Sequence, residues 1–76
     1  MNANQRKNIT KAIELLETAK GMIEEEQGEE ESKFDNLNEG LQNSEKGEKL
    51  QASSEALSSA MSSIEEAIDY CNTATE

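Results

Sequence analysis

The fold is decided by the stretch ITKAIELLETAKGMI, residues 9–23. Large apolar side chains recur in it every seven residues, and alanine follows each of the first two after three residues. The residues concerned are Ile9, Ala12, Leu16, Ala19 and Ile23. This spacing lines one face of an α-helix, at positions a and d of a heptad repeat. Because the residues between them are mostly good helix formers, we expect a helix over about residues 5–33.

The second half of the chain repeats this pattern. Positions a and d are again apolar or small, and they hold Leu50, Leu57, Ala60, Ile64, Ala67, Cys71 and Ala74. Between the two patterns lies a segment with three Asn, one Asp and one Gly, which are residues that favour turns. Ser44 follows this segment as a good N-cap. We therefore expect a loop over about residues 34–43 and a second helix over about residues 44–74.

Alanine at d lets two helix backbones approach closely, and two helices of similar length with a short connection pack antiparallel. In an antiparallel pair, the numbers of facing residues have a constant sum. Five pairs satisfy this condition with sums of 79 or 80, namely Ala12 with Ala67, Ala19 with Ala60, Ile9 with Cys71, Leu16 with Ile64, and Ile23 with Leu57. We therefore predict an all-α fold, an antiparallel two-helix hairpin with an alanine-rich seam. The predicted seam comprises Ile9, Ala12, Ile13, Leu16, Ala19, Ile23, Leu57, Ala60, Met61, Ile64, Ala67 and Ile68.

The size of the chain indicates that the hairpin needs a partner. Its 76 residues make one domain, over residues 1–76, with a small core. Its single cysteine, Cys71, excludes an internal disulfide, and small folds of this kind are commonly stabilised by self-association. The apolar stripe is also wider than one helix contact requires, since it includes residues at e and g: Ile13, Leu15, Met22, Met61 and Ile68. We expect the hairpin to assemble into a homo-oligomeric helical bundle.

The net charge of −10 arises from 17 acidic and 7 basic side chains. It disfavours binding to DNA, RNA or anionic membranes and permits a basic protein partner, or imitation of a nucleic acid. No apolar run approaches the roughly 18 residues that span a bilayer, and the N-terminus lacks the apolar stretch of a signal peptide, so we expect a cytoplasmic protein. Without histidine, a glycine-rich phosphate loop or a nucleophile beside a base, we expect no enzyme activity, no cofactor and no bound metal.

The expected seam becomes polar toward the loop. Glu26 falls opposite Ser53, and Gln27 falls opposite Ser54. Within this distal part, the segment 24–31 contains six Glu residues, which form either a solvated helix face or a binding surface. We expect the distal part to be mobile or to be ordered by a partner.

Charged side chains and one aromatic residue complete the expected register. Basic residues that open the first helix are expected beside acidic residues that close the second, namely Arg6, Lys7 and Lys11 beside Glu65, Glu66 and Asp69. The run 24–31 is expected near Lys46 and Lys49. Tyr70, at position g, is expected to cover the edge of the core or to anchor a partner.

The middle of the chain carries a distinctive motif. It reads Glu-Gln, then Phe-Asp-Asn-Leu-Asn-Glu-Gly-Leu-Gln, then Ser-Glu, and its matching residues are Glu26, Gln27, Phe34, Asp35, Asn36, Leu37, Glu39, Leu41, Gln42, Ser44 and Glu45. The motif resembles one found in a group of small acidic helical proteins of bacteriophages and prophages. Asn38 stands where that pattern usually has proline. The resemblance implies a phage context and brings no activity with it.

Together these features predict a non-enzymatic, phage-type interaction protein that blocks or sequesters a host factor in an infected or lysogenic bacterium, as an anti-defence inhibitor. It would bind a host protein by mimicry of a nucleic acid, or trap a nucleotide signal between subunits of its oligomer. The alternative is a structural or assembly protein of the phage particle that acts by bundling helices. The candidate binding residues lie in the loop and the distal hairpin: Glu26, Gln27, Lys33, Phe34, Asp35, Asn36, Gln42, Ser44, Lys46 and Lys49.

Overall fold

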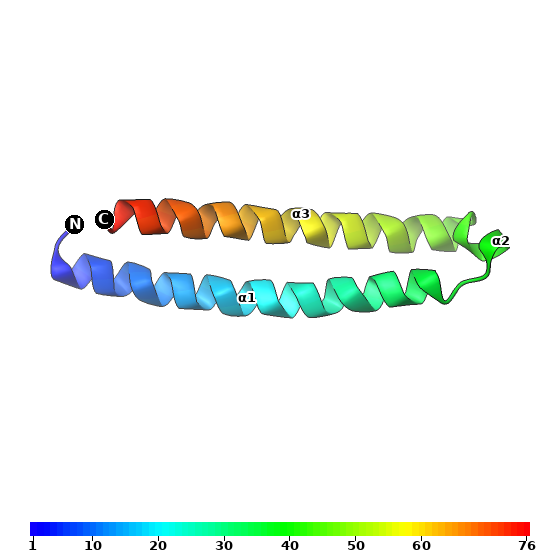
Figure 1. The fold of residues 1–76 in the computed structure, drawn as a ribbon, viewed down its shortest axis with the longest axis horizontal. Helices are drawn as coiled ribbons and strands as arrows, with labels where there is room; N and C mark the ends of the chain where they lie inside the picture. The colour runs from blue at the N-terminus through cyan, green and yellow to red at the C-terminus, as the bar shows by residue number, and fades with distance from the viewer.

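The protein is described by a computed structural model that covers all residues 1–76. It contains three helices and no strand, so the prediction of an all-α fold is confirmed. The helices are α1 (Ala3–Asp35), α2 (Glu39–Gln42) and α3 (Glu45–Ala74). The long helices α1 and α3 lie side by side and run in opposite directions, so that both chain ends lie at the same end of the molecule (Figure 1).

Capping side chains set the start of α1. The Asn2 carboxamide oxygen accepts a hydrogen bond from the backbone N–H of Gln5 at 2.8 Å, and the Gln5 side chain accepts one from the N–H of Asn2 at 2.9 Å. This reciprocal arrangement satisfies two backbone N–H groups that a helix start otherwise leaves unpaired. For this reason α1 begins at Ala3, two residues before the start expected from the apolar pattern.

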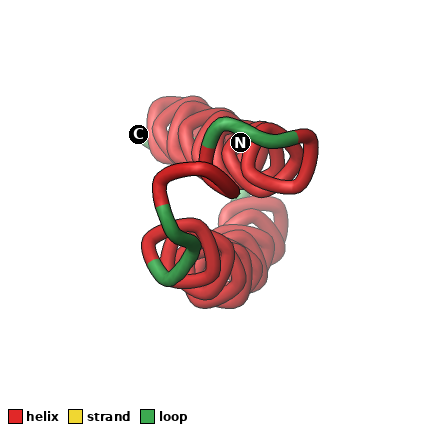
Figure 2. The backbone as a smooth tube through the Cα atoms, turned by 90° about the vertical axis from the view of Figure 1, so that its right-hand side faces the viewer, coloured by secondary structure: helices red, strands yellow, loops and turns green.

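The connection between the long helices is not a plain loop, because it contains the single helical turn α2. The Asn38 side chain accepts a hydrogen bond from the N–H of Leu41 at 3.0 Å and thereby caps α2. Ser44 caps α3, as predicted, by accepting a hydrogen bond from the N–H of Gly47 at 3.4 Å. Figure 2 looks at this end of the molecule and shows the two long helices nearly end-on with the connection spanning them.

The contact face of α1 keeps two heptad positions along its length. The half-buried residues at position a are Ile9, Leu16, Ile23 and Glu30, and those at position e are Ile13, Lys20, Gln27 and Phe34. Position d is half-buried at Ala12 and Ala19 but exposed at Glu26. Toward the loop the contact therefore consists of positions a and e, and Gln27 lies in the seam whereas Glu26 does not.

The distal seam is polar, and the predicted facing of Gln27 and Ser54 is confirmed. The Gln27 carboxamide nitrogen donates a hydrogen bond to the Ser54 hydroxyl at 3.0 Å, which joins α1 to α3. Both residues are half-buried, whereas Glu26 and Ser53 are exposed beside them. The residue numbers of the bonded pair sum to 81, close to the sums of 79 and 80 expected for the apolar pairs.

The expected ion pairs at the two ends of the molecule are not formed. Arg6, Lys7 and Lys11 make no ion pair with α3; the cross-helix ion pair joins Lys20 to Glu65 at 2.7 Å. For Lys7 and Lys11 the reason is geometric, because they lie at outward positions f and c, whereas Lys20 lies at e beside the seam. Arg6 also lies at e and makes no ion pair with α3. At the loop end, Lys49 pairs with Glu45 of its own helix at 3.3 Å and not with the acidic run of α1.

Two helices alone do not enclose a core. No hydrophobic side chain is fully buried, and Gly47 is the one buried residue. The molecule measures 58 × 15 × 13 Å, and its radius of gyration is 17.2 Å, against about 11 Å for a compact chain of this length. Its accessible surface is 5584 Å², which exceeds by about 1,000 Å² the surface of a compact monomer of the same mass. Much of the apolar surface on the two helices therefore remains in contact with water.

Candidate functional site

Four residues of the motif in the middle of the chain have a structural task. Asn36 is the C-cap of α1, and Ser44 is the N-cap of α3. The Gln42 side chain donates a hydrogen bond to the backbone carbonyl of Phe34 at 3.2 Å, which fastens α2 to the end of α1. Gln27 is bonded to Ser54 within the seam. The predicted binding residues Asn36, Gln42 and Ser44 thus hold the connection in shape.

The remaining predicted binding residues are divided between separate surfaces. Phe34 and Asp35 line a shallow, largely polar depression together with Gln27, and Ser54 and neighbouring hydroxyl groups of α3 form its other wall. Glu26 lies exposed on the other side of the seam and lines a depression with Glu30, Ser53, Ala56 and Leu57.

Three of the predicted binding residues are lysines, and they lie on two different helices. Lys46 and Lys49 line a depression with Glu45 and Leu50 on α3. Lys33 lies on α1, where its ammonium group is 3.1 Å from the carboxylate of Glu30. The hydrogen bond to Glu30, together with the charge of that carboxylate, raises the pKa of Lys33 above 10.5. Since Lys33 and Lys49 each have a carboxylate partner within their own helix, the single chain shows no cluster of free cations.

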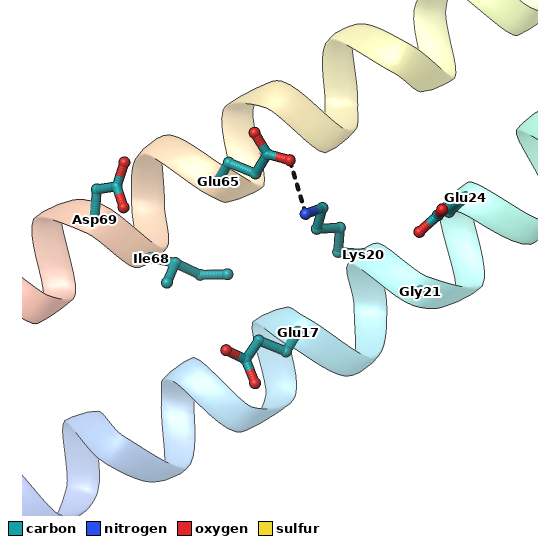
Figure 3. Close-up of a pocket in the computed structure, with 7 residues that line it drawn as sticks. All are labelled: Glu17, Lys20, Gly21, Glu24, Glu65, Ile68 and Asp69. Atoms are coloured by element: carbon teal, nitrogen blue, oxygen red, sulfur yellow. Dashed lines mark ion pairs between the residues drawn. The ribbon is translucent and has the colours of Figure 1, made fainter.

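Along one side of the seam, acidic side chains of both long helices come together. Glu17 and Glu24 of α1 and Glu65 and Asp69 of α3 line one depression, with Lys20 and Ile68 between them (Figure 3). Farther toward α2, Glu31 and Glu55 line the depression that also contains Phe34. We name the surface formed by these six exposed carboxylates, Glu17, Glu24, Glu31, Glu55, Glu65 and Asp69, the acidic edge.

The ion pair between Lys20 and Glu65 lies across the acidic edge. The side chain of Lys20 reaches over the groove between α1 and α3 to the Glu65 carboxylate, as Figure 3 shows. The hydrogen bond to Glu65, and then the negative charges of Glu65, Glu24 and Glu17, raise the pKa of Lys20 above 10.5. One lysine among six carboxylates leaves this edge with a strong net negative charge.

The opposite side of the seam is different in kind. Leu15 is 72% exposed, Met22 is 64% exposed and Tyr70 is 77% exposed. Leu15 and Met22 lie about 100° to one side of the seam on the helical wheel of α1, whereas Glu17 and Glu24 lie about as far to the other side. Tyr70 occupies the corresponding position g of α3. It therefore does not cover the core, as one reading of the sequence suggested, but projects into solvent.

Beside these three side chains lies a strip of uncharged residues, and Lys11, Glu25 and Glu66, three or four residues away on the same helices, flank it. On both long helices the residues facing this side are small, apolar or uncharged polar ones: Asn8, Ala12, Leu15, Ala19 and Met22 on α1, and Ser53, Ala56, Ala60, Ser63, Ala67, Tyr70 and Ala74 on α3. We name this surface the neutral edge. The sequence contained the signal for it, because Leu15 and Met22 are seven residues apart, but its extent becomes clear only when both helices are placed together.

The remaining chemistry of the chain offers no further site. No three His, Cys, Asp or Glu side chains are arranged so that they could hold a metal ion. The thiol of Cys71 is free and half-buried beside the seam. None of the three helices combines the length and the apolar composition needed to cross a lipid bilayer.

Comparison of the chain with models of protein families, with curated proteins and with solved structures finds no match.

Proposed function

We propose that this is a non-enzymatic interaction protein of phage type, which blocks or sequesters a basic host protein through its acidic edge. The observation that carries the proposal is the convergence of carboxylates from α1 and α3 on one side of the seam. Of the 17 acidic side chains, only Glu30, Glu45 and Glu65 are in ion pairs, so most of the negative charge is available to a partner.

The geometry of the acidic edge suits an extended basic groove. Glu17, Glu24 and Glu31 are seven residues apart, which places them about 10 Å from one another along one face of α1. A rigid row of negative charges on a rod 58 Å long is able to occupy a site that normally holds the phosphates of a nucleic acid. Such a mimic would act as an anti-defence inhibitor if the site belongs to a host nuclease or another nucleic-acid-dependent enzyme.

The proposal includes self-association in the cytoplasm of the host. We propose that α1 and α3 act as an antiparallel hairpin with an alanine-rich seam and that hairpins assemble into a helical bundle. This is supported by the absence of any fully buried hydrophobic side chain and by the excess of accessible surface. Trapping of a nucleotide signal is less well supported, because Lys33 and Lys49 are already paired with carboxylates.

The second candidate function is a structural or assembly protein of a phage particle. The neutral edge favours this second function, because a protein that bundles helices presents exposed apolar side chains to its neighbours. The two candidates differ in the surface they require. An inhibitor needs the acidic edge for its partner, whereas an assembly protein needs only the apolar contacts.

Charge reversal tests the proposal. The doubly substituted Glu17→Lys/Glu24→Lys protein changes the acidic edge, and the Glu25→Lys/Glu66→Lys protein has the same net charge but changes the outward faces of the helices. Each protein is used to capture partners from a bacterial lysate, and the affinity for the captured protein is then measured at low and high salt. We expect wild type and the control to bind one basic protein, more weakly at high salt, and the acidic-edge variant to lose it. Equal binding by both variants, or no partner at low salt, would refute the proposal.

A further inference from the structure

We infer that a second copy of this chain docks on the neutral edge, so that two helix pairs form a two-fold symmetric four-helix assembly. The inference deepens the proposed function only in that it identifies the surface through which the proposed oligomer forms. It depends on the exposure of Leu15, Met22 and Tyr70 and on the distribution of charge around them.

The exposed area matches what one partner of the same kind would cover. The chain exposes 5584 Å², about 1,000 Å² more than a compact monomer of its mass. A stable protein–protein interface of ordinary size removes about 800 Å² from each partner. Docking of one further copy would therefore remove most of the excess.

Charge distinguishes the two edges as docking surfaces. Each copy carries a net charge of −10, so two copies repel each other unless they meet where charge is absent. Contact through the acidic edge would place six carboxylates of one copy against six of the other. The neutral edge has no charged side chain between Leu15 and Met22 on that face of α1, or from Ser53 to Ala74 on that face of α3. It is therefore the face on which like-charged copies can approach most closely.

The shape of the neutral edge is complementary to itself. Its large side chains are Leu15, Met22 and Tyr70, and the strip of α3 beside them consists of Ala and Ser residues. In a two-fold assembly each copy contributes both features, so that the large side chains of one copy meet the small-residue strip of its partner. This is the packing of knobs into holes that long helices use when their backbones come close.

Charge also defines where the contact ends. Toward α2 the same side of the seam carries Glu26 and Glu30, which line a depression with Ser53, Ala56 and Leu57. The docking surface is thereby restricted to the half of the molecule that contains the two chain ends. In such an assembly the acidic edges and the α2 ends of both copies remain free, and each copy can still present its carboxylates to a basic partner.

Sedimentation equilibrium of three proteins tests the inference. Leu15→Glu introduces a charge on the neutral edge, and Leu41→Glu introduces the same charge at an exposed leucine of α2, outside it. We expect wild type and Leu41→Glu to sediment with about twice the chain mass of 8.4 kDa. The Leu15→Glu protein should dissociate, with a dissociation constant about tenfold higher or more. Circular dichroism verifies that each variant is helical, and Met22→Glu should act as Leu15→Glu does.

Three outcomes would overturn the inference: a wild-type mass of one chain at high micromolar concentration, equal association of Leu15→Glu and Leu41→Glu, or a mass that increases without limit as concentration rises. These results are separable from those for the acidic edge. A dimeric protein that captures no partner contradicts only the proposed role of the acidic edge. A monomer that captures a partner through Glu17 and Glu24 contradicts the self-association and the docking of a second copy, but not the role of the acidic edge.

Discussion

Replacing Gly47 by alanine is expected to destabilise the protein, although the same change inside a helix normally stabilises it. Gly47 is the third residue of α3 and the one fully buried residue of the chain. A Cβ atom at this position would lie 2.6 Å from the carbonyl carbon of Gln42 and 2.7 Å from the carbonyl oxygen of Leu41, with the Gln42 oxygen closer still. Only a residue without a side chain lets the C-terminal end of α2 pass so close to the first turn of α3.

The magnitude follows from two opposing effects. Alanine is favoured over glycine in a helix by about 1 kcal/mol. Overpacking costs about 1–3 kcal/mol, and the upper part of that range applies here because the atoms in the way belong to the backbone, which cannot rotate aside. We therefore expect a net loss of about 2 kcal/mol for Gly47→Ala. Gly21→Ala, by contrast, should gain about 1 kcal/mol, because a Cβ there has no atom within 4 Å.

Thermal unfolding followed by circular dichroism measures the difference. Protein concentration is held constant, because association makes the melting temperature depend on concentration. In a chain of this size 1 kcal/mol corresponds to about 4–8 °C, so Gly21→Ala should melt above wild type and Gly47→Ala well below it. Equal stabilisation by both changes would show that α2 does not pack against the start of α3 as described.

Three further predictions concern the seam and the ion pair. Ala19→Leu should lower the free energy of unfolding, measured by denaturation, by about 1–3 kcal/mol, because Ala19 is half-buried in the seam. Ala52→Leu, at an exposed site, should change the free energy of unfolding by no more than about 0.5 kcal/mol. Equal effects of the two substitutions would exclude close packing at Ala19. Lys20→Met should lower the melting temperature at pH 8. This difference from wild type should shrink as the pH rises past 10.5, because Glu65 raises the pKa of Lys20 and the ion pair is lost once the lysine deprotonates. A difference in melting temperature that does not change with pH would contradict this role of Lys20. Amide hydrogens around Gln27 should exchange faster than those around Leu16, because the distal seam holds a polar contact in place of apolar ones, and uniform protection along α1 would refute this.

The course of the long helices could be predicted because their apolar spacing is regular over many turns. Ile9, Leu16 and Ile23 mark the contact face of α1, and the cap at Ser44 marks the start of α3. Beyond Ile23 the pattern places both Glu26 and Gln27 near the seam, and in the structure Gln27 is half-buried there whereas Glu26 is exposed. A sequence gives the spacing of side chains but not the exact rotation of each helix toward its partner, and that rotation decides between the two residues.

The connection and the surfaces were less accessible to prediction. The turn α2 depends on the cap at Asn38 and on the space left by Gly47, and neither feature has a periodicity that would single it out. The motif residues Asn36, Gln42 and Ser44 hold the ends of helices in the structure, and their binding of a partner stays a prediction. The acidic and neutral edges are built from residues of both long helices, so their contrast depends on which side of the seam each residue faces.

The fluorescence of Tyr70 tests most directly whether a second copy covers the neutral edge. The chain has one tyrosine and no tryptophan, so its emission reports on this side chain alone, and acrylamide, a neutral quencher, is not repelled by the net charge of −10. In the single chain Tyr70 is 77% exposed. We predict that quenching by acrylamide weakens as protein concentration rises through the range of association, and that Leu15→Glu abolishes this protection. Strong quenching that is the same at every protein concentration, as for a free tyrosine side chain, would show that the neutral edge remains open to water and that no second copy docks there.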